Sequence, residues 1–128
     1  MGKFIIREKR IQKNGSPYFN ISLPLIAADG GVAAYMANQV NAQASKYLPL
    51  DFIELTNMSG RIISLQLDDG DTFIVPDGVI KTISDKPFRR FRVVNLDAVN
   101  DAAIDTIIIQ MQRLPITMDT FIRKFKLK

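Results

Sequence analysis

Short stretches in which hydrophobic and polar residues alternate, separated by turn-forming residues, account for most of the chain. In residues 17–23 and 61–67 the hydrophobic side chains occupy every second position, and a β-branched run follows at 106–113. A period of two places successive side chains on opposite faces, which is typical of a half-buried β-strand. We therefore expect strands in all three segments.

The same pattern predicts eight strands in all, at 3–11, 17–23, 50–57, 61–67, 72–75, 79–84, 88–96 and 106–113. Turns rich in glycine, proline, asparagine and aspartate separate them, as at 57–60, 68–71 and 76–78. Closely spaced strands with turns between them favour an all-β fold over alternating strands and helices. The sequence therefore predicts an antiparallel β-sandwich or jelly roll of about eight strands.

Residues 30–45 interrupt this pattern. They are rich in alanine and glutamine, and Val32, Tyr35, Met36 and Val40 recur at helical spacing. This spacing favours a short helical excursion. The glycines and asparagines of the segment leave a long ordered loop as the alternative, because both residue types weaken a helix.

Composition limits the chemistry that the chain offers. Its 128 residues are a single-domain length, and 47% hydrophobic with 23% charged residues is typical of a globular protein. Cysteine, histidine and tryptophan are absent, which excludes disulfides, thiolate or imidazole metal ligands and the usual cysteine or serine–histidine nucleophiles. We therefore expect no enzyme activity, no cofactor and no metal site. We also expect no membrane span, since no hydrophobic run approaches about 18 residues.

One acidic cluster, formed by Asp68, Asp69 and Asp71, resembles half of a calcium-binding loop. It lacks the regular spacing and the closing glutamate of an EF-hand. Because Gly70 lies among them and tolerates turn conformations, these residues are predicted to form a polar hairpin turn.

Charge is divided between the ends and the body of the chain. Residues 1–13 hold five basic residues and one acidic residue, and 113–128 hold the same numbers, so each end carries a net +4. Residues 14–112 hold 7 basic and 11 acidic residues, a net −4. Hydrophobic residues interleave with the basic ones at both ends, and they gain free energy only when buried, at about 25 cal/mol per Å². We expect both ends to dock, either on the chain's own body or on a partner.

This division predicts three regions: a basic N-terminal arm or first strand at 1–13, a β-sandwich domain at 14–113 and a basic, hydrophobic C-terminal arm at 114–128. Opposite charge on the arms and the body suits contacts between neighbouring copies. The candidate interaction residues of the arms are Phe4, Arg7, Arg10, Phe121, Arg123, Lys124, Phe125 and Lys126.

A further concentration of positive charge lies inside the domain, where three arginines interleave with two phenylalanines: Phe88, Arg89, Arg90, Phe91 and Arg92. One interpretation is a phosphate-facing strip on which Phe88 stacks against bases. The other places Phe91 in the core while the arginines face solvent, pair with carboxylates or contact a partner. We favour the second interpretation and keep all three arginines as candidate interaction residues.

A strand at 52–57 that leads into an Asn-Met-Ser turn, a Val-Pro-Asp-Gly corner at 75–78 and a strand at 91–95 that ends in asparagine follow one another in the chain. In this succession the chain resembles small single jelly-roll virion proteins of bacterial or archaeal viruses, of the penton, minor capsid or decoration type. The resemblance implies a non-enzymatic, symmetric homo-oligomer that contacts other capsid or virion proteins. It also implies assembly in the host cytoplasm and a final location in the virion, and it supplies no catalytic residue.

Two other functions stand as alternatives. A nucleic-acid-binding β-barrel module would place the three internal arginines and the C-terminal Lys124, Lys126 and Lys128 against phosphates. The acidic body disfavours this, because such modules concentrate positive charge on the folded face. A ligand-binding sandwich, such as a receptor-binding tip, is the other alternative, and the low content of tryptophan and tyrosine disfavours sugar stacking.

Overall fold

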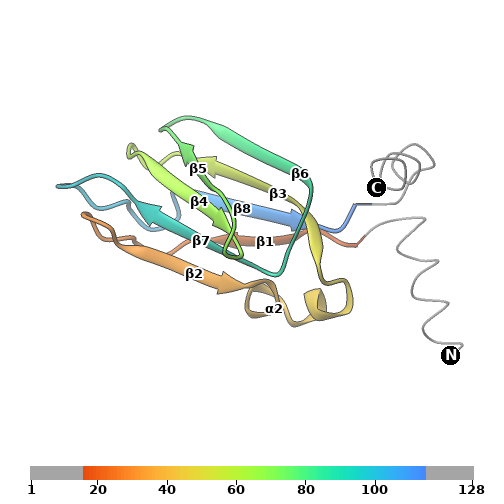
Figure 1. The fold of residues 1–128 in the computed structure, drawn as a ribbon. Helices are drawn as coiled ribbons and strands as arrows, with labels where there is room; N and C mark the ends of the chain where they lie inside the picture. The colour runs from red at the N-terminus through yellow and green to blue at the C-terminus, as the bar shows by residue number, and fades with distance from the viewer. Residues whose placement is uncertain (1–15, 115–128) are drawn as a thin grey trace, which may run out of the picture.

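The computed structural model describes residues 16–114 and folds them into two four-stranded antiparallel sheets (Figure 1). The strands are β1 (Phe19–Ser22), β2 (Val32–Met36), β3 (Leu50–Asn57), β4 (Ile63–Leu67), β5 (Thr72–Val75), β6 (Ile80–Phe88), β7 (Arg90–Asn95) and β8 (Ile107–Gln112). Between β2 and β3 lie a short α-helix, α2 (Ala37–Val40), and a 3-10 helix, η1 (Ala42–Lys46). The predicted all-β sandwich of about eight strands is confirmed. The strand expected at 3–11 lies outside the described residues.

The two halves of the chain pair with each other in a nested way. β1 pairs with β8, β2 with β7, β3 with β6 and β4 with β5, all antiparallel. Successive pairs alternate between the sheets, so that one sheet has the order β1-β8-β3-β6 and the other β2-β7-β4-β5. Pairing of β3 with β8 and of β4 with β7 joins the two halves of each sheet. The fold therefore depends on contacts between residues that are far apart in the sequence.

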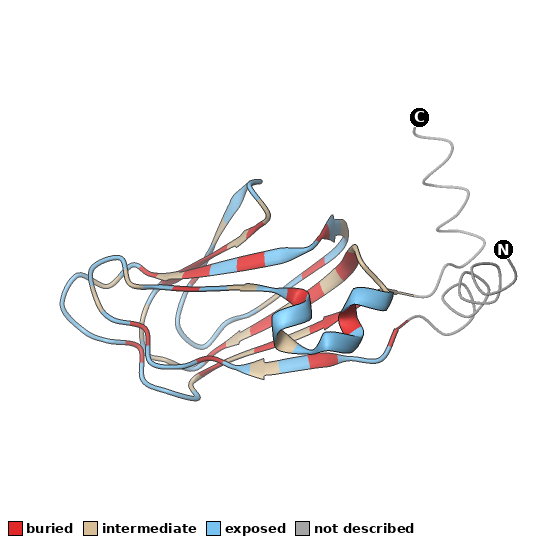
Figure 2. Ribbon diagram, turned by 90° about the horizontal axis from the view of Figure 1, so that it is seen from below, coloured by how far each residue is buried: buried red, intermediate tan, exposed pale blue. Residues whose placement is uncertain are grey.

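The hydrophobic core lies between the two sheets and is built by alternate positions of the strands. Ile63, Leu65 and Leu67 are buried on β4, as predicted. On β3, β7 and β8 the same alternation buries Ile53, Leu55, Phe91, Val93, Ile107, Ile109 and Met111. Figure 2 shows buried and exposed positions following one another along the strands. Burial of this surface, at about 25 cal/mol per Å², is the main force that holds the sheets together.

Segment 30–45 departs most from the expectations. Its first part, Val32–Met36, is strand β2, and only the residues after it are helical. Pairing with β7 explains the strand: Ala33 is buried, and the Tyr35 ring packs against Phe91 with centroids 5.8 Å apart. Burial within a sheet overrides a helical spacing that local propensity favours.

The strand predicted at 88–96 is also wrong in one respect, because the chain changes sheets at Arg89. β6 continues through 85–87, where a break was expected, and ends at Phe88, whereas β7 begins one residue later in the other sheet. A shift of register on β3 and a positive φ of 59° at Asp85 mark an irregularity that lets β6 continue. Pro87 is tolerated there because β6 lies at the edge of its sheet.

Two fully buried asparagines fix the loops at one end of the sandwich, where β3 and β7 both end (Figure 1). The Asn57 amide donates to the carbonyl oxygens of Arg61 and Val75 at 2.8 and 3.1 Å. Its Oδ1 accepts from the backbone N–H and the hydroxyl of Ser59, at 3.0 and 2.6 Å. These bonds satisfy a polar group that would otherwise be expensive to bury. The Asn-Met-Ser turn is therefore a structural device of the fold.

Asn95 does the same for the loop between β7 and β8. Its amide donates to the carbonyls of Ile26 and Asn100, and its Oδ1 accepts from the N–H of Asp97 at 3.0 Å. The Asp97 carboxylate in turn accepts from the backbone N–H groups of Asn100 and Val99 at 2.8 and 2.9 Å. These bonds hold the pKa of Asp97 below its usual value.

Replacing Asn57 with alanine is expected to lower the free energy of unfolding by about 3 kcal/mol, because the change leaves buried carbonyls and a turn N–H without their partner. Urea denaturation measures the loss. Asn20→Ala, at an exposed position of β1, is the matched control and should change stability by no more than about 0.5 kcal/mol. Equal effects of the two substitutions would contradict this role of Asn57.

Candidate interaction face

Three of the predicted interaction residues lie within the described part of the chain, and all three are exposed. Arg89 joins β6 to β7, and Arg90 and Arg92 lie on β7, where they alternate with buried Phe91. Phe88 is fully buried, so its interpretation as a base-stacking residue is wrong. The other candidates lie outside the described residues: Phe4, Arg7, Arg10, Phe121, Arg123, Lys124, Phe125 and Lys126.

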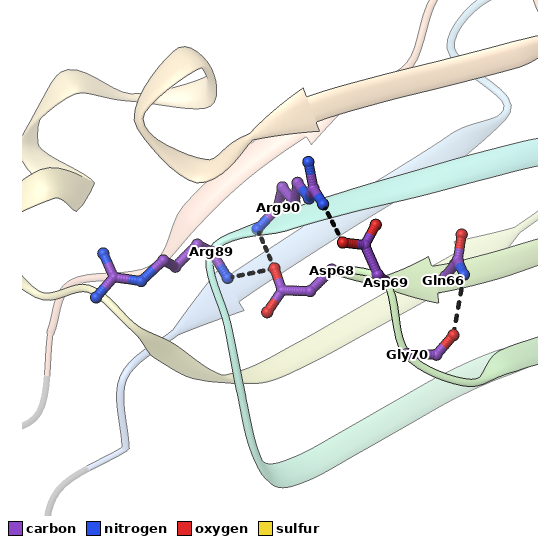
Figure 3. A network of polar contacts seen from close by, with 6 residues as sticks. All are labelled: Gln66, Asp68, Asp69, Gly70, Arg89 and Arg90. Carbon is purple, nitrogen blue, oxygen red and sulfur yellow. Dashed lines mark hydrogen bonds and ion pairs between the residues drawn. The ribbon is translucent and has the colours of Figure 1, made fainter.

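The turn between β4 and β5 is hydrogen-bonded to the segment where the chain crosses from one sheet to the other, between β6 and β7 (Figure 3). Asp68 has a positive φ of 52°, which aspartate tolerates better than most residues. Its Oδ1 accepts from the backbone N–H groups of Arg89 and Arg90 at 3.0 and 3.1 Å, and its own N–H donates to the Arg90 carbonyl at 3.0 Å. The carboxylate thus satisfies two donors that the change of sheet leaves without strand partners.

The other two carboxylates of this turn contact different cations. Asp69 pairs with Arg90 at 2.6 Å and Asp71 with Lys86 at 3.5 Å. Both aspartates are more than four-fifths exposed, so each ion pair adds little stability. Between residues 16 and 114 no three acidic side chains come together as a metal site would require. The predicted polar hairpin turn is confirmed, since 68–71 connect paired strands.

A groove of about 390 Å³ lies on the outer face of the sheet β2-β7-β4-β5, beside α2 and the β4–β5 turn. Ala34 and Met36 line it from β2, Gln66 from β4, and Arg90 and Arg92 from β7. Among the described residues, Arg92 has no ion-pair partner, and its neighbour in register on β2 is the small Ala34. The polar half of this face therefore carries two guanidinium groups, of which only that of Arg90 is in an ion pair with a described residue.

The other half of the same face is hydrophobic. One row across the four strands reads Val32, Val94, Ser64 and Ile74 in register. Ile62 and Leu96 lie beside this row and are joined by a backbone hydrogen bond of 3.0 Å. Val32, Ile62, Ile74 and Leu96 are 46%, 51%, 57% and 45% exposed.

We call the outward side of β2-β7-β4-β5, with its hydrophobic row and its arginines, the outer face. A cluster of exposed hydrophobic side chains with arginine at its margin has the composition of a protein–protein interface. Sequence reasoning found its arginines but missed its hydrophobic row, because that row exists only once the register of four strands is known. The signal available in the sequence was that hydrophobic residues also occupy positions on the exposed side of these alternating strands.

The chain offers no further guidance by similarity: family models, curated proteins and solved structures give no match to it. No helix formed by residues 16–114 is long and hydrophobic enough to cross a bilayer.

Asp68→Ala is expected to lower the free energy of unfolding by about 2 kcal/mol, because it removes an acceptor for two N–H groups and places alanine at a positive φ. Asp69→Ala, its neighbour in the same turn, removes only an exposed ion pair and should cost less than about 1 kcal/mol. Thermal and urea unfolding of the two variants measure the difference. If both variants were equally stable, Asp68 would not anchor the crossing.

Proposed function

We propose that the protein is a non-enzymatic structural subunit of a virus or phage particle, which assembles as a symmetric homo-oligomer at a capsid vertex, as a minor capsid protein or as a decoration protein. The nested strand order carries this proposal. Two four-stranded sheets whose strands pair 1 with 8, 2 with 7, 3 with 6 and 4 with 5 support a jelly roll, a fold used by capsid and lectin domains. A fold alone serves many functions, so the surface has to support the same conclusion.

The outer face supports a role in assembly. Its exposed valine, isoleucine and leucine side chains gain free energy when another hydrophobic surface covers them. Groups of this kind suit packing between subunits, and a closed symmetric assembly would bury the same face on every copy. We expect the partners to be further copies of this chain and other virion proteins.

The two ends of the described fold also support assembly. Ser16 N–H donates to the Arg113 carbonyl and Arg113 N–H donates to the Ser16 hydroxyl, both at 2.8 Å. The chain therefore enters and leaves the sandwich at one place, beside β1. The sequences that continue from there, 1–13 and 114–128, are basic, whereas the body is acidic. Opposite charges favour contact between the arms of one subunit and the body of the next.

The nucleic-acid alternative has less support. Phe88 is buried in the core and is not available for stacking, and Arg90 is already paired with Asp69. The described body also carries more acidic than basic residues, which weakens attraction to phosphates.

The mass of the full chain in solution tests the proposal. Light scattering should give a defined multiple of 14.4 kDa, and deletion of residues 115–128 should lower that multiple, because it removes basic and hydrophobic groups that would contact neighbours. Circular dichroism should show that the shortened chain keeps its strands and unfolds cooperatively.

A variant of full length, with Arg123, Lys124 and Lys126 all changed to glutamine, separates charge from hydrophobic contact. If charge holds the arms in place, this variant should assemble as weakly as wild type does at high salt. A chain that stays monomeric at high concentration, or a shortened chain that keeps the native mass, would contradict the proposal.

A further inference from the structure

We infer that β2 is the edge through which two copies of the chain pair, antiparallel and about a two-fold axis, to form one continuous eight-stranded sheet. The inference rests on the proposed homo-oligomer and names the surface that makes it. Its basis is a comparison of the four strands that lie at sheet edges in the described fold: β1, β6, β2 and β5.

Three of these edges carry features that block pairing with another chain. β1 is four residues long and lies between Pro17 and Pro24, and β5 is equally short and is followed by Pro76. β6 is longer, but it contains an irregularity at Asp85, a proline at 87 and two lysines. Short length, proline, bulges and lysine are the usual protections of an exposed strand.

β2 is one residue longer than β1 and β5, and it has none of the other protections. Its sequence, Val-Ala-Ala-Tyr-Met, contains no charged residue and no proline, and its register with β7 runs without a break over all five residues. The side chains that point away from the core, Val32, Ala34 and Met36, are all exposed. Figure 1 shows β2 on the outside of its sheet, with no described strand beyond it.

On this edge β2 also presents backbone groups that hydrogen-bond to no described residue. Asn95 N–H donates to the Gly31 carbonyl and Ala37 N–H donates to the Arg89 carbonyl. In an antiparallel pair the hydrogen-bonded positions alternate. The backbone N–H and C=O groups of odd-numbered β2 residues therefore point toward β7, and those of even-numbered residues point away from it, toward the open edge. The third outward residue, Met36, already donates its N–H to Gln39 Oε1 at 2.7 Å. Val32 and Ala34 are therefore the residues that offer both N–H and C=O to a partner.

These groups are self-complementary. When two β2 strands run antiparallel with Val32 of one copy opposite Ala34 of the other, both free N–H groups and both free carbonyls of each strand find partners. This register leaves the bond between Met36 and Gln39 in place. In this register Val32, the end of the hydrophobic row, lies opposite Ala34 of the other copy, whose own row continues to Arg92.

Ala34→Pro tests the inference. Proline removes an N–H that makes no bond within the sheet, so it blocks the edge while leaving the pairing of β2 with β7 intact. Association of the full chain, measured by sedimentation across a range of concentrations, should weaken at least about thirtyfold through loss of backbone hydrogen bonds.

The matched control is Thr72→Pro on β5, the edge at the other side of the same sheet. Asp68 N–H donates to the Arg90 carbonyl, and Leu96 N–H donates to the Ile62 carbonyl. These bonds show that the backbone N–H and C=O groups of even-numbered β4 residues point toward β7. Gln66 is one of these, so its partner Thr72 points its N–H outward from β5. Thr72→Pro therefore makes the same chemical change on another edge and should leave association unchanged.

A cysteine pair tests the register without blocking the edge. The natural chain has no cysteine, so Val32→Cys and Ala34→Cys each carry a single thiol. Directly opposed strand positions lie about 5.5 Å apart between Cα atoms, within the range of a disulfide. Under mild oxidation, a mixture of the two variants should form cross-linked dimers faster than either variant alone.

The outcomes separate this inference from the proposed function. If wild type is monomeric throughout, both fail. If wild type assembles but Ala34→Pro assembles equally well, or Thr72→Pro disrupts it as strongly, pairing through β2 is wrong while the homo-oligomer stands. Should Ala34→Pro fail to fold, the cysteine mixture decides: preferential cross-linking supports the inference, and cross-linking no faster than in the single variants overturns it.

Discussion

Antiparallel pairing between β2 and β7 is the interaction on which the rest of the account depends. It turns a segment with helical spacing into a strand, buries Ala33, and sets Tyr35 against Phe91. It also makes β2 an edge strand within residues 16–114, where the backbone groups of two residues hydrogen-bond to no described residue. The same pairing brings Val32 into register with Val94 and so creates the hydrophobic row of the outer face. The burial of Ala33, the hydrophobic row and the proposed mode of assembly all depend on this strand contact.

Much of the fold could be predicted from the sequence, because alternation and turn chemistry are local properties. Strand β4 and the turn at 68–71 are confirmed for this reason: each is specified by residues that are adjacent in the chain. The crossing at Arg89 could not be predicted, since it depends on the Asp68 carboxylate reaching across from another turn. Strand β2 was missed because its conformation is decided by β7, more than fifty residues later in the chain.

The candidate face, too, could be predicted from the sequence only in part. Its arginines could be found by composition, and the alternation of Arg90, Phe91 and Arg92 already indicated that they share an exposed side. Its hydrophobic row could not, because four strands from distant parts of the chain contribute one or two residues each. The asparagines that end β3 and β7 have a structural explanation in their buried side chains, since Asn57 and Asn95 organise loops and leave the surface to carry function.

Amide hydrogen exchange of the full chain at increasing protein concentration tests the central claim, that the open edge of β2 is the surface through which copies associate. The N–H groups of Val32 and Ala34 should exchange more slowly as association proceeds, because they then donate to a second strand. The N–H of Thr72, which points outward from β5, should exchange at the same rate throughout. Assembled protein in which Val32 and Ala34 exchange as fast as in dilute monomer would contradict the account.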